Sequence, residues 1–210
     1  MNRAPETADE RALHWDTVYE SRGTEGVSWY QPAASVSLEL IDVLDVPRHT
    51  AVVDVGGGAS RLADGLVERG FTDISVLDVS KSALDAARGR LDPDAPVTWL
   101  HEDVLDWRPG RRFGLWHDRA VFHFLTEPEH QAGYLAVLRS AIRPGGAVVL
   151  ATFAPDGPEY CSGLPVARYS ARQLAETLGE DFRTVGVRRE EHTTPTGAVQ
   201  AFTWVAGRIG

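Results

Sequence analysis

The chain has 210 residues, of which 43% are hydrophobic and 24% are charged, as in an ordinary globular enzyme. This length predicts one domain that buries roughly 70% of its unfolded surface. With 21 Lys and Arg against 30 Asp and Glu, the net charge is −9. Such an acidic balance opposes binding to nucleic acid or to an anionic membrane, so we expect neither as a partner.

The single cysteine, Cys161, excludes an intramolecular disulfide and any multi-cysteine zinc or metalloid site, and we expect no metal. The first residues, MNRAPETADERALHWD, lack the apolar core of a signal peptide. No run approaches the 18 apolar residues of a membrane-spanning helix. The expected compartment is the cytoplasm.

The first 34 residues are predicted to cover the rest of the domain. Apolar side chains at near-helical spacing predict a helix over Glu10–Ser21, which the stretch Gly23–Gly26 interrupts. Two aromatics, Trp29 and Tyr30, follow just before a proline. They suit either plain core packing or an aromatic cover over a cofactor, and both interpretations stay open.

Beyond residue 34, strands alternate with helices, which predicts a mostly parallel sheet with helices on both faces. Strands are expected at 51–55, Ile74–Leu77, Val97–Leu100, Phe113–Trp116 and Ala147–Phe153. Helices are expected at Ser35–Leu44, 60–69, 81–91 (with Ser80 as N-cap), Pro128–Ile142 and 170–179 (with Ser170 as N-cap). Two further strands, Phe182–Arg189 and Val199–Ala206, have only a short connection, so they should be antiparallel neighbours. We expect a single domain over 1–210, with a cover at 1–34 and a core at 35–210.

The chain is organised around residues 52–60, VVDVGGGAS. A buried strand that runs into a glycine turn and opens a helix is a nucleotide-binding device, because glycine permits close backbone approach and the helix offers unpaired N–H groups. Gly56 and Gly58 fit the first two positions of a dinucleotide fingerprint, but Arg61 stands where a small residue is needed. Asp54 would repel a pyrophosphate and suits a cationic ligand.

Carboxylates follow the next two strands as well. Asp78 ends the strand after the turn and can accept both hydroxyls of a ribose. Asp103 follows the third strand, where it can accept from an adenine amino group while Val104 packs on the ring. Because the carboxyl ends of parallel strands meet at one edge of a sheet, these side chains should share one crevice.

In combination, D-x-G-x-G at 54–58, the acidic ends of the second and third strands, and the RPGG before the fifth resemble class I S-adenosylmethionine-dependent methyltransferases. The resemblance covers about residues 35–207. It implies a Rossmann-like fold of seven strands, mostly parallel, with an antiparallel last strand. The stretches HWDTVYESRG…VSWYQ and HDRAVFHFL are also similar to lysine methyltransferases acting on citrate synthase or elongation factor 1A and, more loosely, to thiopurine methyltransferase.

The resemblance implies S-adenosylmethionine as cofactor and S-adenosylhomocysteine as product. It also implies a set of cofactor-binding residues. These are Asp54, Gly56, Gly57, Gly58, Asp78, Val79, Asp103, Val104, His117, Trp15 and Trp29.

A general base is needed only where the accepting atom is protonated at neutral pH. His117 and His123 flank the stretch after the fourth strand and are the catalytic candidates, since histidine titrates near neutrality. A packed core histidine is the alternative for His123. The Pro/Gly-rich segment 154–168 suits a lid or a substrate wall. The substrate-side candidates are Tyr19, Tyr30, Tyr160, Cys161 and Arg168.

The predicted function is methyl transfer from S-adenosylmethionine to a small molecule. A protein lysine methyltransferase is the alternative within this class and would need an open groove. A nucleotide-binding oxidoreductase of the NAD type, or a non-catalytic adenosine binder, is the alternative from another class. The sequence identifies neither the accepting atom nor an oligomeric state.

Overall fold

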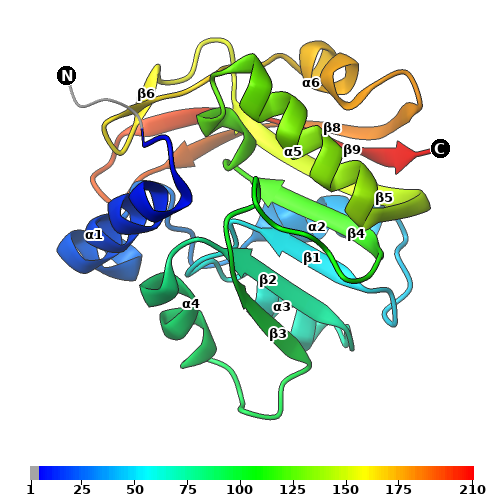
Figure 1. Ribbon diagram of the computed structural model, residues 1–210, viewed down its shortest axis with the longest axis horizontal. Coiled ribbons are helices and arrows are strands. Elements are labelled where there is room, and N and C mark those ends of the chain that lie inside the picture. Colours follow the sequence, from blue (N-terminus) through cyan, green and yellow to red (C-terminus); the bar gives the residue numbers. More distant parts are fainter. Residues whose placement is uncertain (1–4) are drawn as a thin grey trace.

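The structure is a computed structural model that describes residues 5–210 (Figure 1). Its main feature is a seven-stranded sheet of order β3-β2-β1-β4-β5-β9-β8. The strands are β1 (Val52–Val55), β2 (Ile74–Asp78), β3 (Val97–His101), β4 (Phe113–Arg119), β5 (Ile142–Phe153), β8 (Phe182–Thr193) and β9 (Val199–Ile209). The helices are α1 (Ala8–Gly26), α2 (Ser35–Val43), α3 (Leu62–Glu68), α4 (Lys81–Arg88), α5 (Pro128–Ala141) and α6 (Ala171–Leu178).

The sheet has the predicted topology. Strands β3, β2, β1, β4 and β5 pair in parallel, whereas β9 lies antiparallel between β5 and β8. The strand order reverses direction at β1 and β4, and ligands of open α/β sheets bind outside the carboxyl ends of the strands at such a point. The fold class expected from the sequence is therefore confirmed.

Both faces of the sheet are covered because successive side chains of a strand point to opposite sides. Val52 packs into a buried cluster with residues of α2 and α3, and its neighbour Val53 packs into another with residues of α5 and α6. Strands buried on both faces are continuous apolar runs, and that is how β1 and β2 stood out in the sequence.

The predicted helix caps are also present. Ser80 Oγ accepts from Ala83 N at 3.2 Å, so it satisfies a backbone donor that the first turn of α4 leaves without a partner. Ser170 caps α6 together with Gln173 in a capping box. A third cap, Thr7 with Glu10, begins α1.

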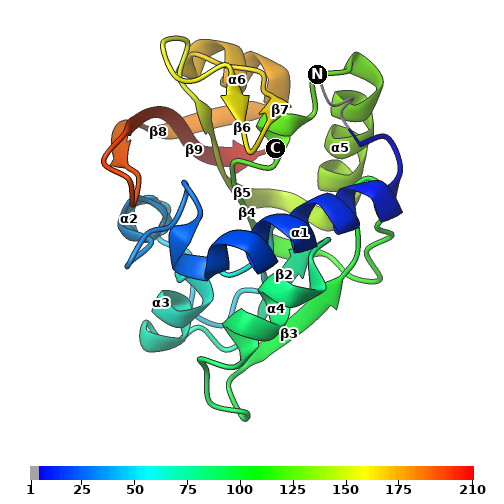
Figure 2. The same cartoon turned by 90° about the vertical axis from the view of Figure 1, so that its left-hand side faces the viewer.

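Helix α1 lies beside the carboxyl ends of the parallel strands, and Figure 2 shows it running across the sheet edge in front of β2 and α4. It is longer than the predicted 10–21. The helix kinks at Gly23, whose φ of 69° is unfavourable for other residues, so the glycine interruption seen in the sequence does bend the chain. Helix α1 thus lies along the edge of the sheet where the parallel strands end (Figure 2).

Several predicted boundaries differ from the structure: β5 begins at Ile142 and not at Ala147, and β8 and β9 extend to Thr193 and Ile209. The end of β4 matters most for the site. Strand β4 does not end at Trp116 but continues to Arg119, and His117 pairs in register with Asp54 on one side and Val149 on the other. His117 therefore lies within the sheet and not in the connection after it. Polar residues after an apolar run predict the end of a strand, but His117 and Asp118 are buried and hydrogen-bonded within the sheet.

The segment 154–168 is a small hairpin of strands β6 (Tyr160–Cys161) and β7 (Leu164–Pro165). It leaves β5 at the edge that α1 covers, and it buries Cys161 at 6% exposure. None of the helices described in 5–210 has the length and apolar character needed to cross a membrane.

Candidate cofactor and substrate site

The glycine turn after β1 is held tightly against β2. The N–H groups of Gly56 and Gly57 both donate to Leu77 O, at 2.7 and 3.2 Å. A Cβ on Gly57 would lie 2.6 Å from Asp54 Oδ2, and one on Gly58 would lie 2.9 Å from Asp78 Oδ2 and from Tyr19 Oη. Gly58 also has a φ of +43°. Glycine is therefore required here, and the turn presents bare backbone to the space above it.

A pocket lies between this turn, the ends of β2 and β4, and α1. One end contains three predicted cofactor residues, Asp78, Asp103 and Val104. The other end reaches the 3-10 turn after β4 and strands β5 and β9. Other predicted residues that line the pocket are Trp15, Tyr19, Trp29, Gly56, Val79, His123 and Cys161.

Asp78 is the most perturbed acid of the pocket. Its Oδ1 accepts from Ser80 N at 2.7 Å, and the side chain is buried beneath α1. Burial, together with the nearby carboxylates of Asp54 and Asp16, raises its pKa to about 7. A carboxylate held in this way gains strongly from hydroxyl donors, which is what a ribose would bring.

Asp103 faces the same end of the pocket but already has partners. Its Oδ1 accepts from Leu105 N at 2.8 Å, and its Oδ2 accepts from Arg11 Nε at 2.5 Å. Arg11 comes from α1, so this ion pair joins the cover to the edge of the sheet. An adenine amino group can reach Asp103 Oδ2 only by displacing or sharing with Arg11.

We therefore expect Arg11→Ala to raise the association rate constant for S-adenosylhomocysteine several-fold, because it frees Asp103 and loosens the first turns of α1. Stopped-flow tryptophan fluorescence would measure the rate, since two tryptophans line the pocket. Arg11→Lys keeps the charge and serves as the matched control. If S-adenosylhomocysteine binds Arg11→Ala at an unchanged or lower rate, the Arg11–Asp103 ion pair does not limit entry of the ligand.

Aromatic side chains form the roof of the pocket. Trp15 packs edge-on against Trp29 and Phe124, with ring centroids 5.6 and 4.9 Å apart. Tyr19 Oη accepts from Trp29 Nε1 at 3.3 Å, and burial raises the pKa of Tyr19. These contacts join α1 to the chain before α2, and Trp29 both packs against the buried core and lines the pocket.

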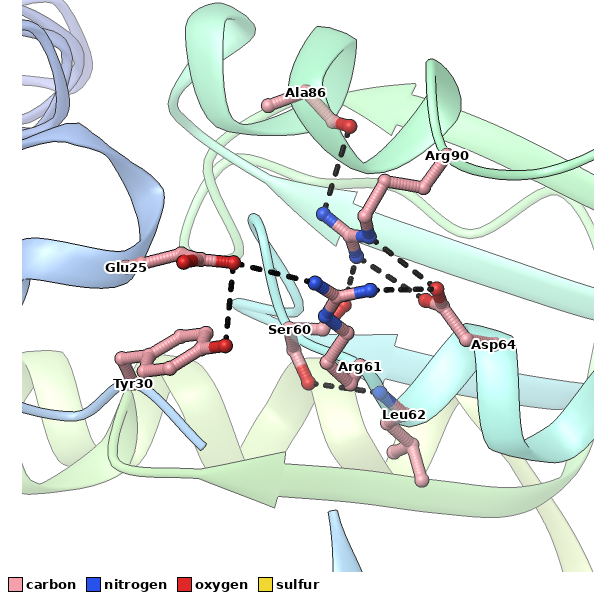
Figure 3. Close-up of polar contacts among 8 residues, drawn as sticks. All are labelled: Glu25, Tyr30, Ser60, Arg61, Leu62, Asp64, Ala86 and Arg90. Carbon is pink, nitrogen blue, oxygen red and sulfur yellow. Dashed lines mark hydrogen bonds and ion pairs between the residues drawn. The ribbon is translucent and has the colours of Figure 1, made fainter. Parts of the chain in front are cut away.

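The end of α1 is attached to the core by a polar network (Figure 3). Glu25 Oε1 accepts from Arg61 Nη2 at 3.4 Å and from Tyr30 Oη at 3.2 Å. Arg61 also approaches Asp64, which Arg90 contacts in turn. Exposed pairs of this kind contribute about 0–1 kcal/mol each. Arg61, which stands where the dinucleotide fingerprint needs a small residue, thus binds Glu25 of α1.

A second pocket adjoins the first and extends beneath the glycine turn. It contains Asp54, Gly57, His117 and Tyr30. His117 is 2% exposed, its Nδ1 lies 2.7 Å from Asp54 Oδ1, and its Nε2 lies 2.9 Å from Ser37 Oγ. Both ring nitrogens are thus engaged with protein groups. Its role as a base stays a prediction.

The turn after β4 shapes the wall of the pocket. Asp118 accepts from the backbone N–H groups of Val121 and Phe122, at 2.7 and 3.1 Å, and from Tyr134 Oη at 2.5 Å. Burial raises its pKa to about 6. Between these residues, Ala120 has a φ of 76°, unusual for a residue with a Cβ. Asp118 is therefore a positioning residue for the turn.

Three predicted site residues do not line either pocket. Tyr160 is 60% exposed on the outside of the hairpin, and Arg168 contacts Glu159 Oε1 at 2.9 Å. Gly58 packs behind the pocket against Asp78 and Tyr19. Conversely, Arg11 and Arg119 line the pocket and were not selected from the sequence. Nothing in their local patterns distinguishes them from surface arginines, because their partners lie far away in the chain.

Comparison with known proteins agrees with this geometry. Residues 52–146 match the family model described as a methyltransferase domain. The chain is similar to thiocyanate methyltransferase 1 of Brassica oleracea, with 30% identity over 151 residues, 69% of this chain and 62% of the relative. It thus spans less than two thirds of that relative's length. It is also similar to malonyl-[acyl-carrier protein] O-methyltransferase 1 of Ilyobacter polytropus, with 23% identity over 89% of this chain and 75% of the relative.

Among solved structures, the fold is similar to a Burkholderia thailandensis 1,6-didemethyltoxoflavin-N1-methyltransferase with bound 1,6-didemethyltoxoflavin and S-adenosylhomocysteine. The TM-score is 0.73 at 20% identity, over 100% of this chain and 93% of that chain. Residues 52–146 are thus a methyltransferase domain. The fold of the chain is thus shared with a methyltransferase whose structure contains S-adenosylhomocysteine.

Proposed function

We propose that this protein transfers a methyl group from S-adenosylmethionine to a small molecule. One observation carries the proposal: Gly56 of the glycine turn and the acids Asp78 and Asp103, which follow β2 and β3, line a single pocket to which α1 contributes the aromatic side chains Trp15 and Tyr19. The thiocyanate methyltransferase among its relatives supports a small acceptor.

The residues present fit this cofactor. Asp78 would accept from the ribose hydroxyls, Asp103 from the adenine amino group, and Val79 and Val104 would pack on the ring. Asp54 lies beneath the turn, and its buried Oδ2 has no hydrogen-bond partner within 5–210. An unsatisfied carboxylate oxygen at this position suits a cationic sulfonium or amino group, and it would repel the pyrophosphate of NAD.

The partly covered site favours a small acceptor over a protein side chain. Trp15 and Trp29 close the pocket from α1 and the chain after it, and the β6–β7 hairpin closes it from the other side with Cys161. A lysine delivered by a folded protein would need an open groove between these two covers. The small-molecule function is therefore the better supported of the two.

The reaction is an in-line displacement at carbon, in which S-adenosylmethionine supplies an electrophilic methyl group with a neutral thioether as leaving group. The protein's own contribution is to orient and to exclude water. Asp78 fixes the position of the ribose, the glycine turn allows close approach, and the roof of Trp15 and Trp29 keeps water out. Orientation alone can supply about 7–11 kcal/mol of the barrier reduction.

Calorimetric titration with S-adenosylhomocysteine and, separately, with NADH tests this function. We expect saturable binding of S-adenosylhomocysteine at micromolar concentration and none of NADH. Binding of NADH alone would favour the oxidoreductase alternative. Absence of binding to either ligand, in a protein shown to be folded by its thermal transition, would overturn the proposal.

The acidic surface supports the absence of nucleic acid as a partner, and a cytoplasmic location stays a prediction of the sequence. The oligomeric state stays open.

A further inference from the structure

The end of the pocket nearest β5 and β9 contains buried N–H donors without acceptors. No group of residues 5–210 forms a hydrogen bond with Arg119 Nε, Arg119 Nη2 or His123 Nε2. Both side chains line the same pocket, and His123 is fully buried while the Arg119 side chain is 11% exposed. Buried donors of this kind are unfavourable unless an acceptor reaches them, so they point to a ligand.

The Arg119 guanidinium is held in place by its other contacts. Its Nη1 donates to Trp29 O at 3.1 Å, and its Cζ lies 4.5 Å from the centroid of the Phe202 ring. Glu190 Oε2 is 4.0 Å from Nε, which is too long for a hydrogen bond. That carboxylate is engaged elsewhere, because it accepts from Gln31 and Trp204. Arg119 Nε and Nη2 are thus held in place without an acceptor among residues 5–210.

His123 is a hydrogen-bond donor toward the pocket. Its Nδ1 accepts from the backbone N–H of Phe153 at 3.4 Å, so the network assigns the proton of the neutral ring to Nε2. Burial and the positive charge of Arg119 lower the pKa of His123 to about 3, so the ring is neutral at pH 7. It therefore has no lone pair directed at the pocket with which to act as a base there.

We propose that Arg119 and His123 bind the methyl acceptor, and that this acceptor is a small, singly charged anion. The inference rests on the proposed methyltransferase function and specifies its substrate class. Phe124, Phe153 and Phe202 wall this end of the pocket, which favours a compact acceptor with little hydration. A charged acceptor atom would satisfy donors that no described protein group satisfies.

An anionic acceptor also needs no base, because its attacking atom carries no proton. A lone pair of the anion forms the new bond to the methyl carbon, the carbon–sulfur bond of the sulfonium breaks, and its electron pair stays on sulfur. A negative and a positive charge thereby become two neutral products, and no proton moves. Such a reaction is favoured in a pocket of low polarity, where separated charges are poorly solvated.

Calorimetric titration of the protein saturated with S-adenosylhomocysteine tests the inference. The probes are sodium thiocyanate and sodium acetate, and their neutral counterparts of similar shape are acetonitrile and acetamide. We expect at least one of the two anions to bind saturably, and neither neutral molecule to do so. His123→Phe keeps the ring shape and should weaken anion binding about tenfold.

The double variant Arg119→Met, Glu190→Gln removes the buried cation and its neighbouring carboxylate together, so neither charge is left alone. It should bind the anion at least tenfold more weakly while its affinity for S-adenosylhomocysteine changes less than threefold. Arg189→Met, on the exposed side of β8, is the matched control and should bind as the wild type does.

The outcomes separate the inference from the function on which it rests. Failure of the wild type to bind S-adenosylhomocysteine would overturn the methyltransferase function itself. Binding of S-adenosylhomocysteine without either anion, equal binding of the neutral molecules, or undiminished anion binding in the double variant would overturn only the assignment of the acceptor.

Discussion

Replacing Asp78 with asparagine is expected to abolish most of the cofactor affinity and to make the free protein more stable above neutral pH. The amide oxygen can still accept from Ser80 N, so the turn is retained. Each charge-assisted hydrogen bond lost to a ribose hydroxyl corresponds to about 1.5–3 kcal/mol. We expect calorimetry to show at least tenfold weaker binding of S-adenosylhomocysteine.

The stability effect follows from the raised pKa of Asp78, about 7 against an ordinary value of 3.8. Between these values the unfolded chain has lost the proton that the folded chain keeps, so folded stability falls as pH rises from about 4 to 7. The Asp78→Asn variant has no ionisable group at this position, so its stability does not fall through the ionisation of residue 78. Its Tm should exceed that of the wild type at pH 8, and the difference should shrink toward pH 4.

Ionisation of Asp78 should lower the stability of the free protein but raise its affinity for the cofactor, since the ribose hydroxyls donate better to the carboxylate. Wild-type affinity for S-adenosylhomocysteine should fall as pH decreases below about 7, with proton release on binding measurable by calorimetry in buffers of different ionisation enthalpy. A wild-type affinity independent of pH between 5.5 and 8 would exclude Asp78 as the ribose acceptor. A variant less stable than the wild type at pH 8 would contradict the burial argument.

Local pattern was sufficient for most of the fold. The apolar runs of β1 and β2, the cap at Ser80 and the glycine turn are properties of a few consecutive residues, and the structure has them where they were expected. The acids Asp78 and Asp103 could be placed because the carboxyl ends of parallel strands meet at one edge. Topology alone brought these two residues together.

Local pattern failed where a polar side chain is buried by distant partners. Arg119 looks like a surface residue at the end of a strand, yet it contacts Trp29 O and lies over Phe202, 90 positions before it and 83 after it in the chain. Arg11 likewise reaches Asp103, 92 positions away. Contacts at such separations have no periodic signature, so the two arginines of the pocket could be found only from the structure.

His117 is likewise a polar side chain buried by distant partners, Asp54 and Ser37. Its replacement is the second large effect we expect. An ionised Asp54 accepts only, so His117 Nδ1 donates to it, and Nε2 forms a hydrogen bond with the Ser37 hydroxyl. In this arrangement the ring fixes Asp54 beneath the glycine turn and supports α2 against β4. A base would instead need an Nε2 lone pair available to the acceptor.

His117→Ala should therefore reduce both stability and cofactor affinity. It leaves a buried carboxylate without its donor and opens a cavity, which together cost about 3–5 kcal/mol of unfolding free energy. Because the glycine turn lies directly on Asp54, the affinity for S-adenosylhomocysteine should fall at least tenfold. Thermal unfolding and calorimetric titration measure the two effects on the same sample.

His117→Asn distinguishes a positioning residue from a base, because its amide can donate to Asp54 but cannot take up a proton. We expect this variant to recover most of the Tm and of the cofactor affinity lost in His117→Ala. A base contributes nothing to binding of S-adenosylhomocysteine, which contains no reacting methyl group. Wild-type affinity and Tm in His117→Ala would therefore refute the positioning role and return His117 to the catalytic step.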